Sequence, residues 1–257
     1  MKIKFIILGC GSSLGVPRID GYFGNCNPRN KKNYRTRCCA LIKSKNKNVL
    51  IDTSPDLKYQ LIKNKIKNID KVFYTHHHAD QTHGINELRF FYLKNRKKIN
   101  IYTNNLTKKY LLNSFGYCFK KNKGYPPILQ NNSLKQNHTY KDNGITINLK
   151  SIKVEHGSID SICYIINNKL AYASDVSKIY QKDYKKLANL KYLVIDCLQY
   201  NHHPSHYGLL DILELVKKIK PKKTILTNLN STLDYKKIQK ILPRNIIPAY
   251  DGLSLTI

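Results

Sequence analysis

A run of histidines directly after a short apolar segment constrains this chain more than any other feature. Residues 75–84 read Thr-His-His-His-Ala-Asp-Gln-Thr-His-Gly and follow a segment, 72–74, that we predict to end a strand. His76, His78 and Asp80 are spaced two residues apart, and alternate residues of an extended segment point to the same side. Imidazole and carboxylate groups are ligands of zinc, manganese and iron. The spacing predicts a metal site, although a polar loop rich in histidine would give the same pattern.

Further polar residues follow other apolar runs, each near the end of a predicted strand. Taken alone, an aspartate after a strand is usually a helix cap or a turn residue, and a histidine is usually a surface residue. Together they favour a site built on strand ends of a layered α/β fold. These residues are His156, Asp175, Asp196, His203 and His206.

Several longer segments carry a resemblance to a known family. They are the H-x-H-x-D motif, His156 before Gly157, Asp175 after a strand, and the segments 9–17, 35–38, 51–57, 84–89 and 249–252. In this order they resemble the metallo-β-lactamase fold hydrolases. The similarity is closer to one branch, the PhnP-type cyclic phosphate phosphodiesterases, which are relatives of tRNase Z, and it spans nearly the whole chain.

The resemblance implies an α/β fold, a four-layer αββα sandwich with a metal site at one edge. It implies that His76, His78 and His156 bind a first metal ion, zinc or manganese. Asp175 would bridge two ions and Asp80 would bind the second. His206 lies where phosphodiesterase relatives place a histidine near the leaving group, so Asp80 and His206 are the expected catalytic residues.

Two positions depart from the family pattern. The usual motif has a histidine where this chain has Gln81, and the usual late histidine falls near 228–230, where we take Asn230 as the counterpart. Amide oxygens are weaker ligands than imidazole for a borderline-soft ion. We therefore expect one tightly bound divalent ion, with Gln81 and Asn230 beside a weak second position.

The expected substrate is a small anionic phosphodiester, and cyclic phosphodiesters belong to this class. Arg35 and Arg37, in the first long loop, could hold phosphate oxygens as bidentate forks, and His203 is a further candidate contact. One alternative is an RNA-processing nuclease of the same fold. The other is a degenerate relative that binds a ligand without catalysis.

The net charge of +29 favours an anionic ligand, but lysine is abundant everywhere in this chain. Nucleic acid is therefore a less favoured partner than a small phosphodiester.

Gly9-x-Gly11 misses the dinucleotide-binding fingerprint, since the next glycine is Gly15 and Pro17 opposes the helix that should follow.

The length of 257 residues fits one domain, 1–257. Seven irregularly spaced cysteines argue for a reducing compartment, and we expect a cytoplasmic protein. The apolar part of the N-terminus is too short for a signal peptide, and no apolar run is long enough to span a membrane. A homodimer is compatible with these observations.

The hydrophobic pattern predicts two packed sheets flanked by helices. Predicted strands cover 2–8, 39–43, 48–52, 71–75, 99–103, 145–149, 151–155, 162–167, 170–174, 192–196, 224–227 and 253–257. Predicted helices cover 56–65, 84–93, 105–115, 178–188, 207–219 and 234–241. The segments 17–37 and 116–143 are predicted to be long irregular loops, which are often functional lids.

Overall fold

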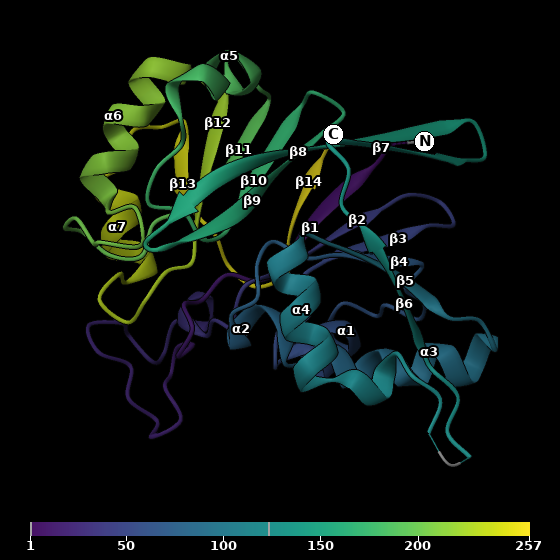
Figure 1. The fold of residues 1–257 in the computed structure, drawn as a ribbon. Helices are drawn as coiled ribbons and strands as arrows, with labels where there is room; N and C mark the ends of the chain where they lie inside the picture. Colours follow the sequence, from purple (N-terminus) through teal and green to yellow (C-terminus); the bar gives the residue numbers. More distant parts are fainter. Residues whose placement is uncertain (1, 123) are drawn as a thin grey trace.

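Two seven-stranded β-sheets lie at the centre of the molecule, as a computed structural model describes it for residues 2–122 and 124–257 (Figure 1). The first sheet contains β1 (Lys4–Gly9), β2 (Cys39–Lys43), β3 (Asn48–Ile51), β4 (Lys71–Phe73), β5 (Ile99–Thr103), β6 (Leu129–Ser133) and β14 (Leu253–Thr256). Its order is β14-β1-β2-β3-β4-β5-β6. The strands from β3 to β6 are parallel, and the remaining pairs are antiparallel.

The second sheet contains β7 (Asn137–Asp142), β8 (Ile145–His156), β9 (Ile159–Ile166), β10 (Leu170–Ala173), β11 (Tyr192–Asp196), β12 (Lys223–Thr227) and β13 (Ile246–Pro248). Its order is β13-β12-β11-β10-β9-β8-β7. The strands from β10 to β13 are parallel to one another, and β9 is antiparallel to both β8 and β10. The carboxyl ends of β8, β10, β11 and β12 therefore meet at one edge of this sheet.

Helices cover the outer face of each sheet (Figure 1). The first sheet carries α1 (Leu57–Lys63), α2 (Ala79–Thr82), α3 (Leu88–Asn95) and α4 (Asn105–Ser114). The second carries α5 (Tyr184–Leu187), α6 (Leu209–Ile219) and α7 (Tyr235–Ile241). Short 3₁₀ helices are η1 (Lys31–Asn33), η2 (Ile85–Glu87), η3 (Gly116–Cys118) and η4 (Gln181–Asp183). None of the helices in the described residues is long and apolar enough to cross a membrane.

Three apolar clusters hold these layers together. Between the sheets, Phe5 and Phe73 of the first sheet belong to the same cluster as Tyr172 of the second. The alternate residues of the first sheet, such as Leu50, pack against α1, α3 and α4, while the second sheet packs against α5, α6 and α7. Strands buried on both faces read as continuous apolar runs, which is why most of them are predictable from the sequence. The predicted αββα sandwich is confirmed.

The main error in the predicted elements concerns the segment 116–143. It is not one irregular lid, because it contains η3, β6 and β7. Both strands lie at sheet edges and read Leu-Gln-Asn-Asn-Ser and Asn-His-Thr-Tyr-Lys-Asp, so they lack the apolar alternation that marks a strand. The three-residue β13 and the four-residue α2 are too short to give a periodic signal. The predicted strands 145–149 and 151–155 are one continuous strand, β8.

Candidate metal centre

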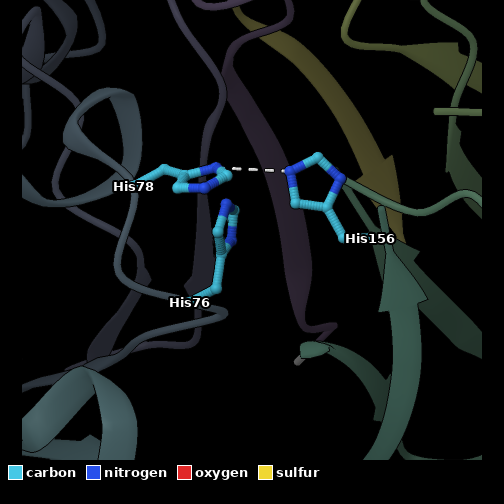
Figure 2. Close-up of side chains that lie close together, drawn as sticks. All are labelled: His76, His78 and His156. Atoms are coloured by element: carbon cyan, nitrogen blue, oxygen red, sulfur yellow. Dashed lines mark hydrogen bonds between the residues drawn. The ribbon is translucent and has the colours of Figure 1, made fainter. Parts of the chain in front are cut away.

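Three imidazoles converge at the edge where the two sheets meet. His76 and His78 lie in the segment after β4, and His156 ends β8. Each offers a ring nitrogen, and these three atoms lie within 4.8 Å of one another. Figure 2 shows the rings facing a common point, with His78 Nδ1 3.3 Å from His156 Nε2. Two of the H-x-H-x-D residues thus converge with a histidine that lies far away in the sequence.

Hydrogen bonds on the outer nitrogens orient two of these rings. His156 Nδ1 donates to the backbone oxygen of Ser205 over 2.6 Å, which leaves Nε2 free to act as a ligand. His76 Nδ1 lies 3.0 Å from Thr75 Oγ1, and that hydroxyl donates to Asp52 Oδ2 over 2.8 Å. His76 Nε2 is buried without a hydrogen-bond partner among the described residues. A buried ring nitrogen that faces two other imidazoles is what a metal ligand requires.

The electrostatic environment keeps the three imidazoles neutral. Burial lowers the pKa of His76 well below its usual value, and the neighbouring His156 and His78 lower it further. Burial, and then His206, lowers the pKa of His156 to about 4. Burial also lowers the pKa of His78. Since a metal ion binds neutral imidazole, the donor set fits a divalent cation such as zinc.

Two carboxylates lie beside the histidines. Asp80 is in α2 and Asp175 follows β10, and the side-chain amide of Gln81 donates to both, at 3.2 Å and 3.1 Å. Burial raises the pKa of Asp175, and the charges of Asp80 and Asp196 raise it further. Burial also raises the pKa of Asp80. Several carboxylates that lie close together and are buried repel one another, so a cation bound between them is stabilised.

His206 completes a second group of potential ligands. Ring nitrogens of His156 and His206 and a carboxylate oxygen of Asp175 lie within 4.8 Å of one another. His206 Nδ1 is 2.6 Å from Asp196 Oδ2, which fixes the ring. Burial lowers the pKa of His206, but Asp196 outweighs burial and raises it to about 9. At neutral pH, without an added cation, this ring is therefore an imidazolium with a proton on both nitrogens.

Asn228, rather than Asn230, is the amide beside the carboxylates. Its Nδ2 lies 3.3 Å from Asp175 Oδ1 and 3.1 Å from Asp196 Oδ1. Asn230 borders an open cavity above the carboxylates, as Asn228 does. Its Oδ1, however, accepts hydrogen bonds from Thr232 N and Oγ1 at 2.9 Å and 2.7 Å. Asn228, two residues before the expected Asn230, is therefore the amide next to the second metal position. The turn after β12 directs the side chain of Asn228 toward the carboxylates.

The two arginines expected to hold phosphate are occupied elsewhere. Arg35 is buried, and its guanidinium donates to the backbone oxygens of Leu233 and Asn230 at 2.6 Å and 3.1 Å. It therefore ties the loop 17–37 to the segment before α7. Arg37 forms an ion pair with Asp56, with Nη2 2.6 Å from Oδ1. Neither arginine lines the cavity over the histidines, so the structure does not bring Arg35 and Arg37 to the place where they were expected to bind substrate.

An open cavity of about 600 Å³ lies over the histidines and carboxylates. His203, the third predicted substrate contact, does line it, and its ring lies 5.3 Å from that of His206 between centroids. Most of the residues that line it are polar, and they include His78, Asp80, His156, Asp175 and His206. The cavity therefore gives a small molecule access to the histidine cluster from solvent.

Asp52 lies outside the set of site residues predicted from the sequence, whereas Asp196 is one of the predicted strand-end residues. Asp52 accepts hydrogen bonds from both the N–H and the hydroxyl of Thr75 and thereby holds the segment that carries His76. It has a positive φ of 64°, which is uncommon for a residue other than glycine. Asp196 orients His206. Both aspartates directly follow apolar strand residues, so their position at strand ends was the available signal.

Comparison with known proteins agrees with this geometry. Residues 47–227 match the family model described as a beta-lactamase superfamily domain. The crystal structure of a new diphosphatase from the PhnP family superposes with a TM-score of 0.88 and 28% identity, covering 100% of this chain and 98% of the other. Human tRNase Z, short form, superposes with a TM-score of 0.69 and 16% identity, covering 99% of each chain. At that identity the second match shows the fold alone.

A curated protein of Porphyromonas gingivalis, named octanoyltransferase, is 27% identical over 260 residues. The match covers 99% of this chain and 52% of the relative, so this chain spans about half of the relative's length. The relative's name describes that longer protein.

Proposed function

The chain belongs to the β-lactamase superfamily, and from this premise we propose that it is a metal-dependent hydrolase of small phosphodiesters. The observation that carries the proposal is the convergence of His76, His78 and His156 beside Asp80 under an open polar cavity. The PhnP-family match at 28% identity supports phosphoryl chemistry. Because that protein is a diphosphatase, a diphosphate bond is a second bond type to include among the substrates.

We propose that His76, His78 and His156 hold one divalent ion, and that Asp175 adds a carboxylate to it. Three nitrogen donors favour zinc, whereas manganese is better suited to carboxylate oxygens. A bound ion would lower the pKa of a water molecule and polarise a phosphoryl oxygen. Asp80 would serve as the proton acceptor for the attacking water, because its carboxylate lines the open cavity.

A second ion is expected to bind weakly. The amide of Gln81 already donates to both Asp80 and Asp175, so it partly neutralises the carboxylates that a second cation would bind. Asn228 makes a similar contact with Asp175 and Asp196. His206 is the remaining imidazole near this position, and it would have to lose its proton to bind an ion.

We assign His206 to the leaving group. Asp196 holds Nδ1, which leaves the Nε2 proton available to the departing oxygen. The buried Asp196 is oriented in turn by the backbone N–H of Val176, at 2.9 Å. This pair would hold the ring in one orientation and supply a proton where negative charge develops.

The proposal is tested by hydrolysis of bis-(p-nitrophenyl) phosphate. Purified protein supplied with zinc or manganese should release p-nitrophenol. Treatment with a chelator should stop the release, and added metal should restore it. The monoester p-nitrophenyl phosphate serves as the control for contaminating phosphatase. If folded, metal-loaded protein releases no p-nitrophenol above the rate in buffer, the proposal is wrong. The alternative of a binding protein without catalysis would then be favoured.

Replacement of His206 by alanine should slow the reaction according to the leaving group. A general acid contributes about 10²- to 10⁴-fold. We expect a loss in this range for diphenyl phosphate, whose phenolate leaves poorly, and a much smaller loss for bis-(p-nitrophenyl) phosphate. Rates of the two esters give the comparison. The variant His203→Ala is the matched control, since its ring neighbours His206 without contacting Asp196, and it should affect both esters alike. Equal losses for both esters in His206→Ala would argue against proton donation.

We also propose that residues 1–257 act as one hydrolase domain in a reducing compartment such as the cytoplasm. All seven cysteines are buried as free thiols, which supports this proposal.

A further inference from the structure

A second cavity, of about 700 Å³, opens beside α3. Its lining includes three tyrosines and two arginines, together with Leu93: Tyr92, Tyr117, Tyr125, Arg89 and Arg96. This set of residues differs entirely from the lining of the metal-centre cavity. We call it the tyrosine–arginine cleft. It is connected to the catalytic segment through η2, where Asn86 accepts a hydrogen bond from the hydroxyl of Tyr117.

The aromatic side chains of this cleft are unusually accessible. Tyr117 is 55% exposed, Tyr125 is 64% exposed, and Leu93 on α3 is 46% exposed. Most large apolar side chains of the protein lie in the three core clusters. Exposed aromatic rings along a concave surface provide faces on which a planar group can stack.

The positive charge of the cleft is not explained by the general abundance of lysine. The chain has 45 basic residues, of which only seven are arginines, and two of those seven line this cavity. Within residues 2–122 and 124–257, neither Arg89 nor Arg96 forms an ion pair, whereas Arg18 and Arg37 each have a carboxylate partner. The residues that line the cleft include no aspartate or glutamate.

One of these arginines already lies against an aromatic ring. Arg89 Cζ is 5.7 Å from the centroid of the Tyr125 ring, within cation–π range. The guanidinium therefore lies near the tyrosine, and no residue in the described part of the chain forms an ion pair with it. Guanidinium groups bind phosphate in a bidentate manner and tyrosine rings stack on nucleobases.

We propose that the tyrosine–arginine cleft binds a nucleotide unit, with the base stacked on its tyrosines and the phosphate on Arg89 and Arg96. The unit could be a free nucleotide or part of a single strand, since both present the same base and phosphate. This site goes beyond the proposed hydrolysis and does not depend on the metal centre.

Binding of AMP and of a phosphorothioate adenylate octamer to the full chain tests the proposal. Titration calorimetry or fluorescence anisotropy should detect both, and ribose 5-phosphate should bind at least about tenfold more weakly than AMP because it lacks the base. Tyr125→Ala should raise the Kd for AMP about 5- to 150-fold, the range for one stacked base. Arg89→Ala should raise it about 10- to 150-fold, the range for a lost hydrogen bond to a charged group. If the loop of Tyr125 is perturbed, Arg89→Ala on α3 still reports on the site.

The matched controls are Arg18→Ala and Tyr22→Ala. These residues form another exposed arginine–tyrosine pair, with Arg18 Cζ 4.5 Å from the ring centroid, but Asp20 neutralises that arginine. Both controls should bind AMP as the unaltered protein does.

The two sources of the nucleotide unit give different results. Equal affinity for AMP and the octamer supports a free nucleotide. An octamer that binds at least tenfold more tightly, with a steeper dependence on salt, supports a single strand. Absence of binding at millimolar AMP and octamer, unchanged affinity in Tyr125→Ala and Arg89→Ala, or equal binding of ribose 5-phosphate would overturn the proposal. Release of p-nitrophenol is measured separately, so failure of hydrolysis is distinguishable from failure of nucleotide binding.

Discussion

Replacement of Asp80 by asparagine should lower the turnover of bis-(p-nitrophenyl) phosphate by about 10²- to 10⁴-fold, the usual contribution of a catalytic base. Asparagine has nearly the same shape as aspartate but cannot accept the proton. Asp80 lies on the open side of the histidine cluster and accepts a hydrogen bond from Gln81, so the substitution leaves the packing of α2 intact. The measurement is kcat/KM at saturating metal, with circular dichroism to confirm folding.

The matched control for this substitution is Asp70→Asn. Asp70 precedes β4, at the opposite end of the strand that leads to His76 and His78, and pairs with Lys47 at the surface. It should leave turnover unchanged. An Asp80→Asn protein that keeps near wild-type turnover would show that Asp80 is neither base nor ligand. The catalytic assignment would then have to move to Asp175 or Asp196.

The residues of the metal centre were predictable where the potential ligands lie at or directly after the end of a strand. His76 and His78 are close in the sequence, and the position of His156 at a strand end is visible as a change from apolar to polar residues. Their convergence depends on the two sheets facing each other at one edge, which no local pattern encodes. Only the resemblance to a known family supplied that expectation before the structure did.

Other features depend on the path of a loop, and for these the sequence was insufficient. Arg35 reads as a surface phosphate ligand in an irregular segment, yet it is buried against backbone oxygens more than 190 residues away. The edge strands β6 and β7 read as loop because most of their residues are polar and no apolar alternation marks them. In each case the deciding partner comes from a distant part of the chain.

The choice between one and two bound ions depends on two amides. Gln81 Nε2 bridges Asp80 and Asp175, and Asn228 Nδ2 contacts Asp175 and Asp196. An amide nitrogen can donate a hydrogen bond to a carboxylate but cannot bind a cation, and an amide oxygen is a poor donor to zinc. The unaltered protein is therefore expected to retain about one zinc ion per chain.

The double substitution Gln81→His with Asn228→His should raise the zinc content from about one toward two ions per chain. It replaces both amides by imidazoles next to carboxylates that are already in place. The backbone at Asn228 is left-handed, with φ of 59°, and histidine is among the residues that tolerate this conformation best. Elemental analysis after gel filtration gives the ratio of metal to protein.

The matched control is Gln81→His with Asn230→His, which places the second imidazole on the residue whose side chain contacts Thr232. Because that position does not face Asp175, the control should stay near one ion per chain. Two tightly held ions in the unaltered protein would mean that the amides do not exclude the second ion. A folded Gln81→His/Asn228→His protein that still holds one ion would mean that the carboxylates, rather than the missing imidazoles, limit the second position.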